Sequence, residues 1–200
     1  RLRTMEQQYT TLTKDINNVD NKDAIVYAYI KSRMNYKTSI ADNVTEKEIS
    51  EKLGIPLSTV KRSVSRLKSN KNLIDKVISN NVIADGSYKT YNKYYMAKCN
   101  ENFFYIYNSF FNDDMNIAEA SERIKIKNFL LKLKAVCKKE TNKYISENPY
   151  LDRLNKTELS KKLGIDTKTL NNYLEMAVNA GHIKYITNGL LILNKSIIPD

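Results

Sequence analysis

The chain has 200 residues, 42% of them hydrophobic, which is enough for one larger domain or for two small domains with their own cores. Its 33 Lys and Arg against 22 Asp and Glu give a net charge of +11, which favours a polyanionic partner such as nucleic acid. The longest apolar runs, such as Ala24–Ile30, are far too short to span a membrane, so we expect no membrane partner.

Three helices and a tight turn are predicted in the first half of the chain. A helix is expected over Lys22–Met34, and Thr45 followed by Glu48 is a reciprocal capping signal for the start of the next one. Gly54 ends that second helix, because glycine adopts the positive φ that a sharp change of direction requires. Three aliphatic residues at helical spacing would hold the helix after the turn against the core: Val60, Val64 and Leu67.

Strands are predicted after this helix-turn-helix unit. The segments Leu73–Ala84 and Tyr88–Ala97 are rich in β-branched and aromatic residues, and Asn80-Asn81 and Asp85-Gly86 are turn candidates. Three helices followed by a β-hairpin form the winged-helix arrangement.

The second half repeats this organisation. Glu158–Thr169 matches Glu48–Thr59 at seven of twelve positions, with the glycine in the same place. Asn155 supplies the capping signal before this copy, and the carboxylate of Asp166 can cap the helix after its turn. The repeat therefore predicts a second helix-turn-helix unit.

The segments before and after the second unit resemble those around the first. A helix with one apolar face is predicted over about Ala118–Lys139, and short strands are predicted at Ile183–Ile186 and Leu190–Leu193 around Asn188-Gly189. The segment Lys125–Lys143 carries seven lysines and a single acidic residue. We interpret these lysines as a solvated helix face, with contact to an anionic partner as the alternative.

The expected fold is mainly α with small β-hairpin wings (α+β). It consists of two tandem winged helix-turn-helix domains, an N-terminal DNA-binding domain over residues 1–100 and a C-terminal domain over residues 101–200.

The helix after the first turn is the best candidate for reading DNA. From Lys52 to Ile74 the chain carries six basic residues and no acidic one. Arg62 is the first choice for base reading, because an arginine can pair bidentately with guanine in the major groove. Lys68 and Lys71 lie further along the helix and are better placed for phosphates.

The full set of predicted DNA contacts draws on both helix-turn-helix units and on the first hairpin. It comprises Ser58, Thr59, Lys61, Arg62, Ser65, Arg66, Lys68, Lys71, Lys76, Ser87, Lys89, Lys93, Lys168, Asn171 and Asn172. Charges that merely solvate an exposed face are the alternative in the first unit. In the second, Glu175 opposes phosphate approach, so a protein-binding surface is an equal alternative.

Enzymatic functions find little support in the sequence. His182 is the only histidine, so the paired histidines of a rolling-circle nicking enzyme are absent, and no glycine-rich phosphate loop ends in Gly-Lys-Ser/Thr. Cys99 and Cys137 lack metal-ligand spacing, and we interpret both as core or half-buried residues. We expect no catalytic residues, no metal and no cofactor.

The stretch from Asp23 through the predicted hairpin resembles the helix-turn-helix domains of plasmid and phage replication initiators and related bacterial regulators. The resemblance rests on Ala28-Tyr29-Ile30, Glu48–Val60, Leu73-Ile74 and Tyr91–Tyr95. It implies sequence-specific binding to double-stranded DNA at origin repeats, host replication proteins as a further partner, and a monomer or homodimer in the bacterial cytoplasm, associated with the nucleoid or a plasmid. The two halves would act as a pseudo-dimer on major-groove faces about 34 Å apart.

Three alternatives to replication initiation remain open. A transcriptional repressor would bind an inverted repeat, and a partition or conjugation accessory protein would bridge DNA to another protein. A scaffold that uses the same fold for protein contacts alone would not retain DNA.

Overall fold

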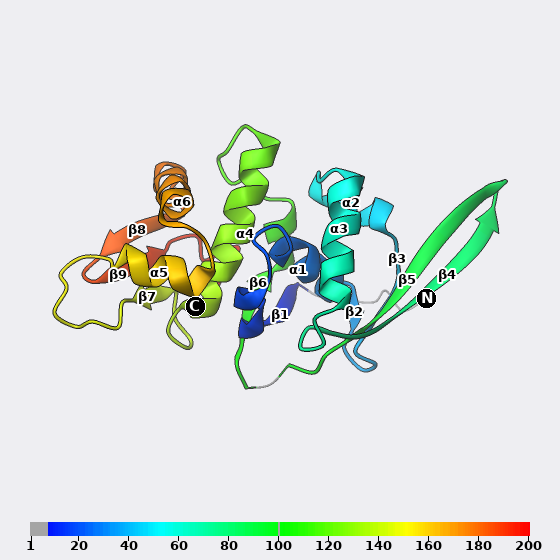
Figure 1. The fold of residues 1–200 in the computed structure, drawn as a ribbon, viewed down its shortest axis with the longest axis horizontal. Coiled ribbons are helices and arrows are strands. Elements are labelled where there is room, and N and C mark those ends of the chain that lie inside the picture. Colours follow the sequence, from blue (N-terminus) through cyan, green and yellow to red (C-terminus); the bar gives the residue numbers. More distant parts are fainter. Residues whose placement is uncertain (1–7, 100) are drawn as a thin grey trace.

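The computed structural model describes residues 8–99 and 101–200. One element order, helix, strand, helix, helix and hairpin, occurs in each half of the chain (Figure 1). The elements of the first half are β1 (Tyr9–Thr13), the 3-10 helix η1 (Lys14–Asn18), α1 (Ala24–Ser32), β2 (Met34–Asn35), β3 (Ile40–Val44), α2 (Glu46–Leu53), α3 (Leu57–Lys68), β4 (Ile74–Ala84) and β5 (Ser87–Met96). The rest are β6 (Phe103–Tyr107), the 3-10 helix η2 (Asn108–Phe111), α4 (Ala120–Val136), β7 (Lys143–Ile145), α5 (Lys156–Leu163), α6 (Thr167–Asn179), β8 (Ile183–Ile186) and β9 (Gly189–Ile192).

The expectation of a mainly α protein is wrong. Within the described residues six α-helices are joined by nine strands in three sheets, ordered β1-β6, β2-β3-β5-β4 and β7-β9-β8. The chain is therefore an α+β protein, and its assignment to two tandem winged helix-turn-helix domains is not confirmed. The sequence underestimates the strand content because short strands such as β1 and β7 gain their stability from partners that are distant in sequence.

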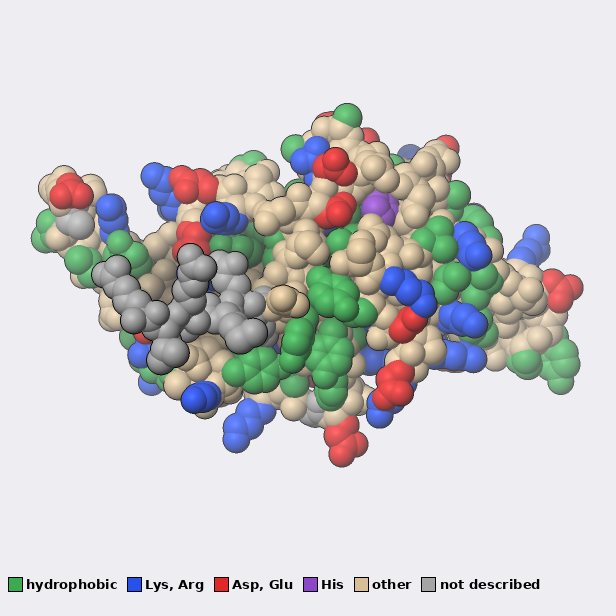
Figure 2. Space-filling view, turned by 180° about the vertical axis from the view of Figure 1, so that it is seen from behind, with side chains coloured by type: hydrophobic (Ala, Val, Ile, Leu, Met, Phe, Trp, Pro, Cys, Tyr) green, Lys and Arg blue, Asp and Glu red, His purple; other side chains and the backbone are tan. Residues whose placement is uncertain are grey.

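The two-stranded sheet joins segments from opposite sides of the predicted domain boundary. β6 runs antiparallel to β1. Leu12, Phe104 and Ile106 are buried on its inner face, as the alternation of side chains along a strand requires. Tyr9 and Tyr105 are exposed on the other face, with ring centroids 5.4 Å apart. Hydrophobic side chains gather near the centre of the view in Figure 2, over this part of the fold.

The two ends of the described chain meet at β6. β1 pairs along one edge of it, and the Tyr107 amide donates to the Ile197 carbonyl at 2.9 Å on the other. The buried hydrophobic residues of both halves form one cluster. The halves therefore share a core rather than being joined by a linker alone.

Helix α4 lies between the two halves and packs against both (Figure 1). The predicted single apolar face is present, since Ile126, Phe129, Leu130 and Leu133 are buried. The remaining faces are largely buried too, because α1 and η1 cover one side and α5 and α6 cover the other.

The interpretation of the α4 lysines as a solvated face is wrong for three of them. Lys127, Lys132 and Lys134 are buried, and each ammonium donates to backbone carbonyl oxygens. Burial lowers the pKa of all three, and lowers that of Lys127 to about 8. The hydrogen bonds to these carbonyl oxygens thus replace part of the hydration that the buried ammonium groups lose.

Lys132 joins three segments through one ammonium. Its Nζ lies 2.9 Å from the Val19 carbonyl oxygen, 3.0 Å from Asn21 Oδ1 and 2.7 Å from the Leu163 carbonyl oxygen at the end of α5. Two further bonds cross the same interface: Asn17 Nδ2 donates to the Lys162 carbonyl at 2.6 Å, and the Ile25 amide donates to Asn128 Oδ1 at 2.8 Å.

We expect Lys132→Met to destabilise the fold. The substitution keeps the apolar stem but leaves acceptors of both halves without this donor, which should lower the free energy of unfolding by about 3 kcal/mol. Lys125→Met is the control, because Lys125 is exposed on the same helix and its change should stay within about 0.5 kcal/mol. Urea unfolding monitored by circular dichroism measures both, and equal stabilities would contradict the role of Lys132.

The lowered pKa of Lys127 predicts that the stability of the fold depends on pH. Its pKa is about 8 in the folded state against 10.5 for an ordinary lysine, so between these values the unfolded state binds more proton and stability rises with pH. Lys127→Met lacks this titration. The free energy of unfolding of the parent minus that of the variant should therefore be larger at pH 10 than at pH 7. A difference that does not change with pH would show that the ammonium is not desolvated.

Candidate nucleic-acid interface

The two helix–turn–helix corners form as the sequence predicts. The Thr45 hydroxyl accepts from the Glu48 amide at 3.0 Å, and the Asn155 side chain accepts from the Glu158 amide at 3.1 Å. Gly54 closes α2 at φ 66°, and Gly164 closes α5 at the same φ. A left-handed residue at this position lets the following helix leave at a sharp angle.

The reciprocal half of each capping signal is absent. The Glu48 carboxylate accepts from the Tyr29 hydroxyl at 2.8 Å, and that of Glu158 accepts from the Tyr144 hydroxyl at 2.6 Å. Each carboxylate therefore ties its helix to the preceding helix or strand instead of to its own N-cap. In both tyrosines burial and then the bond to the glutamate raise the pKa of the hydroxyl.

Helix α3 turns one face inward and one outward. Val60, Val64 and Leu67 are buried, which confirms the predicted anchor. The outward face carries exposed polar and basic side chains, namely Ser58, Lys61, Arg62 and Ser65, with Thr59 half-buried at its edge. Arg62 Nε lies 3.3 Å from the Ser58 carbonyl oxygen, so the guanidinium lies along the helix surface.

Arg66 takes a different position from the one its spacing suggests. Its Nε and Nη2 donate to the two carboxylate oxygens of Asp23 at 2.8 and 2.7 Å, and Asp23 is buried just before α1. The buried Ser63 hydroxyl donates to the same carboxylate at 2.6 Å. The hydrogen bond to Asp23 raises the pKa of Arg66. This cluster locks α3 onto the start of α1, a partnership 43 residues apart that the sequence analysis missed.

The other predicted contacts of the first half are spread along α3 and the hairpin. Lys68 is half-buried at the end of α3, and Lys71 Nζ donates to the Asp75 carbonyl at 2.8 Å. Lys76, Ser87 and Lys89 are exposed on the hairpin. Lys93 lies on the part of β5 nearest the body. Its Nζ is 3.8 Å from Asp42 Oδ2 and lies over the Tyr95 ring.

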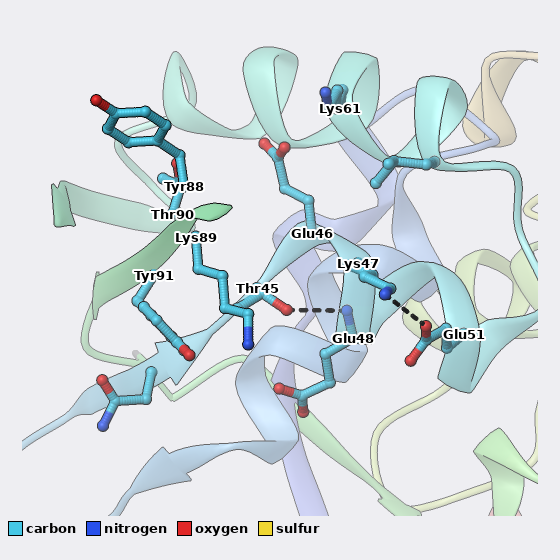
Figure 3. Close-up of a pocket in the computed structure, with 12 residues that line it drawn as sticks. Thr45, Glu46, Lys47, Glu48, Glu51, Lys61, Tyr88, Lys89, Thr90 and Tyr91 are labelled. Carbon is cyan, nitrogen blue, oxygen red and sulfur yellow. Dashed lines mark hydrogen bonds and ion pairs between the residues drawn. The ribbon is translucent and has the colours of Figure 1, made fainter. Parts of the chain in front are cut away.

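A cleft of about 530 Å³ separates α2 and α3 from β5. Lys61 and Tyr88 lie at opposite sides of it, with Glu46 between them (Figure 3). Glu48 and Glu51 also line it, together with Lys47, which pairs with Glu51, so the α2 side is net acidic while Lys61 makes the α3 side basic. A polyanion would therefore be repelled from the floor of the cleft and attracted to the outer face of α3.

The second unit presents a weaker version of the same face. Lys168, Asn171 and Asn172 are exposed on α6, where the Asp166 carboxylate caps the helix by accepting from the Thr169 amide at 2.8 Å. Lys156 Nζ donates to Asn171 Oδ1 at 2.8 Å, and Glu175 is exposed on the same helix. The charge of this face is mixed, so it offers a polyanion less attraction than α3 does.

Comparison with known proteins finds no family model, no curated protein and no solved structure that matches the chain.

Across residues 8–99 and 101–200, His, Cys, Asp and Glu do not cluster in groups of three or more suited to a metal ion, and no helix has the length and apolarity to cross a bilayer. His182 is buried with Nε2 at 2.6 Å from the Met115 carbonyl oxygen, and both cysteines are free thiols, Cys99 partly exposed and Cys137 buried.

The two arginines of α3 should behave differently on substitution. Arg66→Met removes the bidentate partner of a buried carboxylate and should lower the free energy of unfolding by about 2 kcal/mol. Arg62→Met, one turn earlier on the exposed face, should change it by less than about 0.5 kcal/mol. Chemical unfolding of the two variants beside the parent measures both. Equal losses would contradict the anchoring role of Arg66.

Proposed function

We propose that this protein binds double-stranded DNA sequence-specifically, with α3 in the major groove. The observation that carries the proposal is the outward face of α3, where Ser58, Lys61, Arg62 and Ser65 stand exposed above a buried aliphatic stripe. No acidic residue lies in this helix. A rigid helix with such a face suits a groove about 12 Å wide, which admits an α-helix.

The side chains of α3 divide by the contacts they can make. Arg62 is long, exposed and central on the face, so it is the candidate for a bidentate bond to guanine. Ser58 and Ser65 lie beside it and can reach base edges or phosphate oxygens. Lys61, Lys68 and Lys71 are better suited to phosphates, because an ammonium group interacts as a point charge without directional preference.

Electrostatics favours approach from the α3 side. The net charge of +11 attracts a polyanion, and Lys52–Ile74 contributes six positive charges and no negative one, although that of Arg66 is paired with Asp23. The carboxylates of α2 face the cleft beneath the hairpin, so the duplex would lie across α3 and the outer hairpin rather than inside the cleft. We leave Arg66 out of the proposed DNA contacts, because its guanidinium is bonded to the Asp23 carboxylate.

The second unit would make a weaker contact through Lys168, Asn171 and Asn172. An asparagine can bond an adenine edge bidentately, but the exposed Glu175 disfavours phosphate nearby. The resemblance of Glu48–Val60 to replication initiators makes repeated sites at a plasmid or phage origin the first DNA to test. Host replication proteins are the further partner that such a role would require.

Selection from a random duplex pool tests the proposal. The parent should enrich a defined site and lose affinity steeply as salt rises. Arg62→Ala should weaken binding to that site by about 1–3 kcal/mol and relax preference at one base pair. Lys68→Ala should instead weaken binding to all sequences alike and reduce the salt slope by about one.

Lys125→Ala provides the matched control, since Lys125 is an exposed lysine on α4 and outside the proposed contact set. Its affinity and sequence preference should equal those of the parent. A parent protein that retains no DNA at low salt would overturn the proposed function. An Arg62→Ala variant with unchanged preference would overturn the assignment of α3 as the reading helix.

A further inference from the structure

The β4–β5 hairpin extends well beyond the body of the molecule (Figure 1). Near the body its strands are packed, since Asn92, Tyr94 and Met96 are buried and β3 pairs with β5 as far as Asn92. Beyond that point no strand of residues 8–99 or 101–200 pairs with the hairpin. Every side chain described between Ser79 and Thr90 is exposed, so this outer segment has water on both faces.

The end of the hairpin carries large apolar side chains that no core requires. Ile83 is 67% exposed and Tyr88 is 81% exposed, and Val82 is exposed beside them. Ile83 and Tyr88 are directly opposite each other in the strand register. Directly opposite residues share one face of a hairpin, so the two side chains form a single apolar pair.

A tight turn places this apolar pair close to the tip of the hairpin. Ala84 pairs with Ser87, and Asp85 and Gly86 between them adopt φ values of 53° and 75°. Two consecutive left-handed residues form the tight two-residue turn that matches the twist of the strands. The apolar pair therefore lies one residue pair from the tip, on an element only two strands wide.

The position of the tip connects it to the proposed DNA surface. Tyr88 and Lys89 line the same cleft as Lys61 of α3, from its opposite side (Figure 3). Between Lys76 and Lys93 the hairpin carries three lysines and one acidic residue, Asp85. A duplex that lay across α3 would thus meet a positively charged hairpin with an apolar end.

We propose that Ile83 and Tyr88 wedge between base pairs in the minor groove beside the major groove that α3 occupies, and that they bend the duplex. This inference rests on the proposed function. Apolar side chains inserted into the minor groove partly unstack a base step and kink the duplex by about 20–90°. The Tyr88 ring offers a stacking surface to the opened base, and the lysines of the hairpin lie near the flanking phosphates.

The wedge also predicts which DNA is preferred. A pyrimidine–purine step such as TA unstacks more readily than other steps, so the bound site should contain one at a fixed distance from the bases read by Arg62. Asp85 would be close to phosphates on both strands. Asp85→Asn should therefore tighten binding by about two- to fivefold, because asparagine keeps the left-handed turn and removes the repulsion.

A bending measurement on the selected site tests the wedge. In a duplex labelled with a fluorophore at each end, the distance between the two ends should decrease when the parent binds. The fluorescence of 2-aminopurine placed at the predicted step should increase as the base unstacks. The double variant Ile83→Thr with Tyr88→Thr keeps strand-forming residues at exposed positions. It should still bind with the salt dependence of the parent, while affinity falls by about five- to tenfold and bending is lost.

Val82→Thr is the matched control, because Val82 is only one residue pair further from the tip but pairs with Lys89 on the other face. It should bend DNA as the parent does. A parent that binds its site without bending it, or a double variant that bends it fully, would overturn the wedge and leave the proposed function standing. A parent that binds no DNA overturns both. Loss of self-association in the DNA-free double variant, with bending retained, would identify the tip as a protein contact and overturn the wedge.

Discussion

The ammonium group of Lys132 is the interaction on which the relation between the two halves depends. It bonds the segment after η1 and the last turn of α5 at once, so one side chain fixes both against α4. A buried charge is unfavourable unless hydrogen bonds replace its lost hydration, and here three acceptors do so. Because these acceptors belong to both halves, neither half can shift along α4 without leaving the charge unsatisfied.

The same logic explains how α3 is presented. Its inner side is fixed by an aliphatic stripe and by the Asp23 carboxylate, which binds Arg66 and Ser63. A surface that recognises a rigid partner gains when its groups lose little conformational freedom on binding. The helix therefore divides its basic side chains between two tasks: one guanidinium holds the helix in place, and the other remains on the surface. Only the structure distinguishes the two arginines, since both lie on a helix rich in positive charge.

The features that the sequence predicts correctly are those governed by local backbone chemistry. The caps at Thr45 and Asn155, the left-handed glycines and the Asp85-Gly86 turn all depend on a few neighbouring residues, and the buried stripe of α3 follows from helical period. The features missed are those that require a distant partner. The pairing of β1 with β6 lacks any local signal, and the buried lysines of α4 carry charges that are normally found at the surface. The role of each candidate DNA contact remains a prediction, because neither exposure nor charge identifies a ligand.

The place of β6 has a consequence for the order in which the chain acquires its structure. β1 leaves the ribosome before its hydrogen-bonding partner, which follows only after three α-helices and the long hairpin have been synthesised, and the Ile197 carbonyl on the far edge comes later still. Contacts between residues so far apart in sequence form slowly, because a long loop must close first. Until translation passes Tyr107, β1 lacks the strand that pairs with it, and the nascent first half exposes the unpaired backbone groups of its edge. A chaperone that shields such edges during elongation would act on this interval.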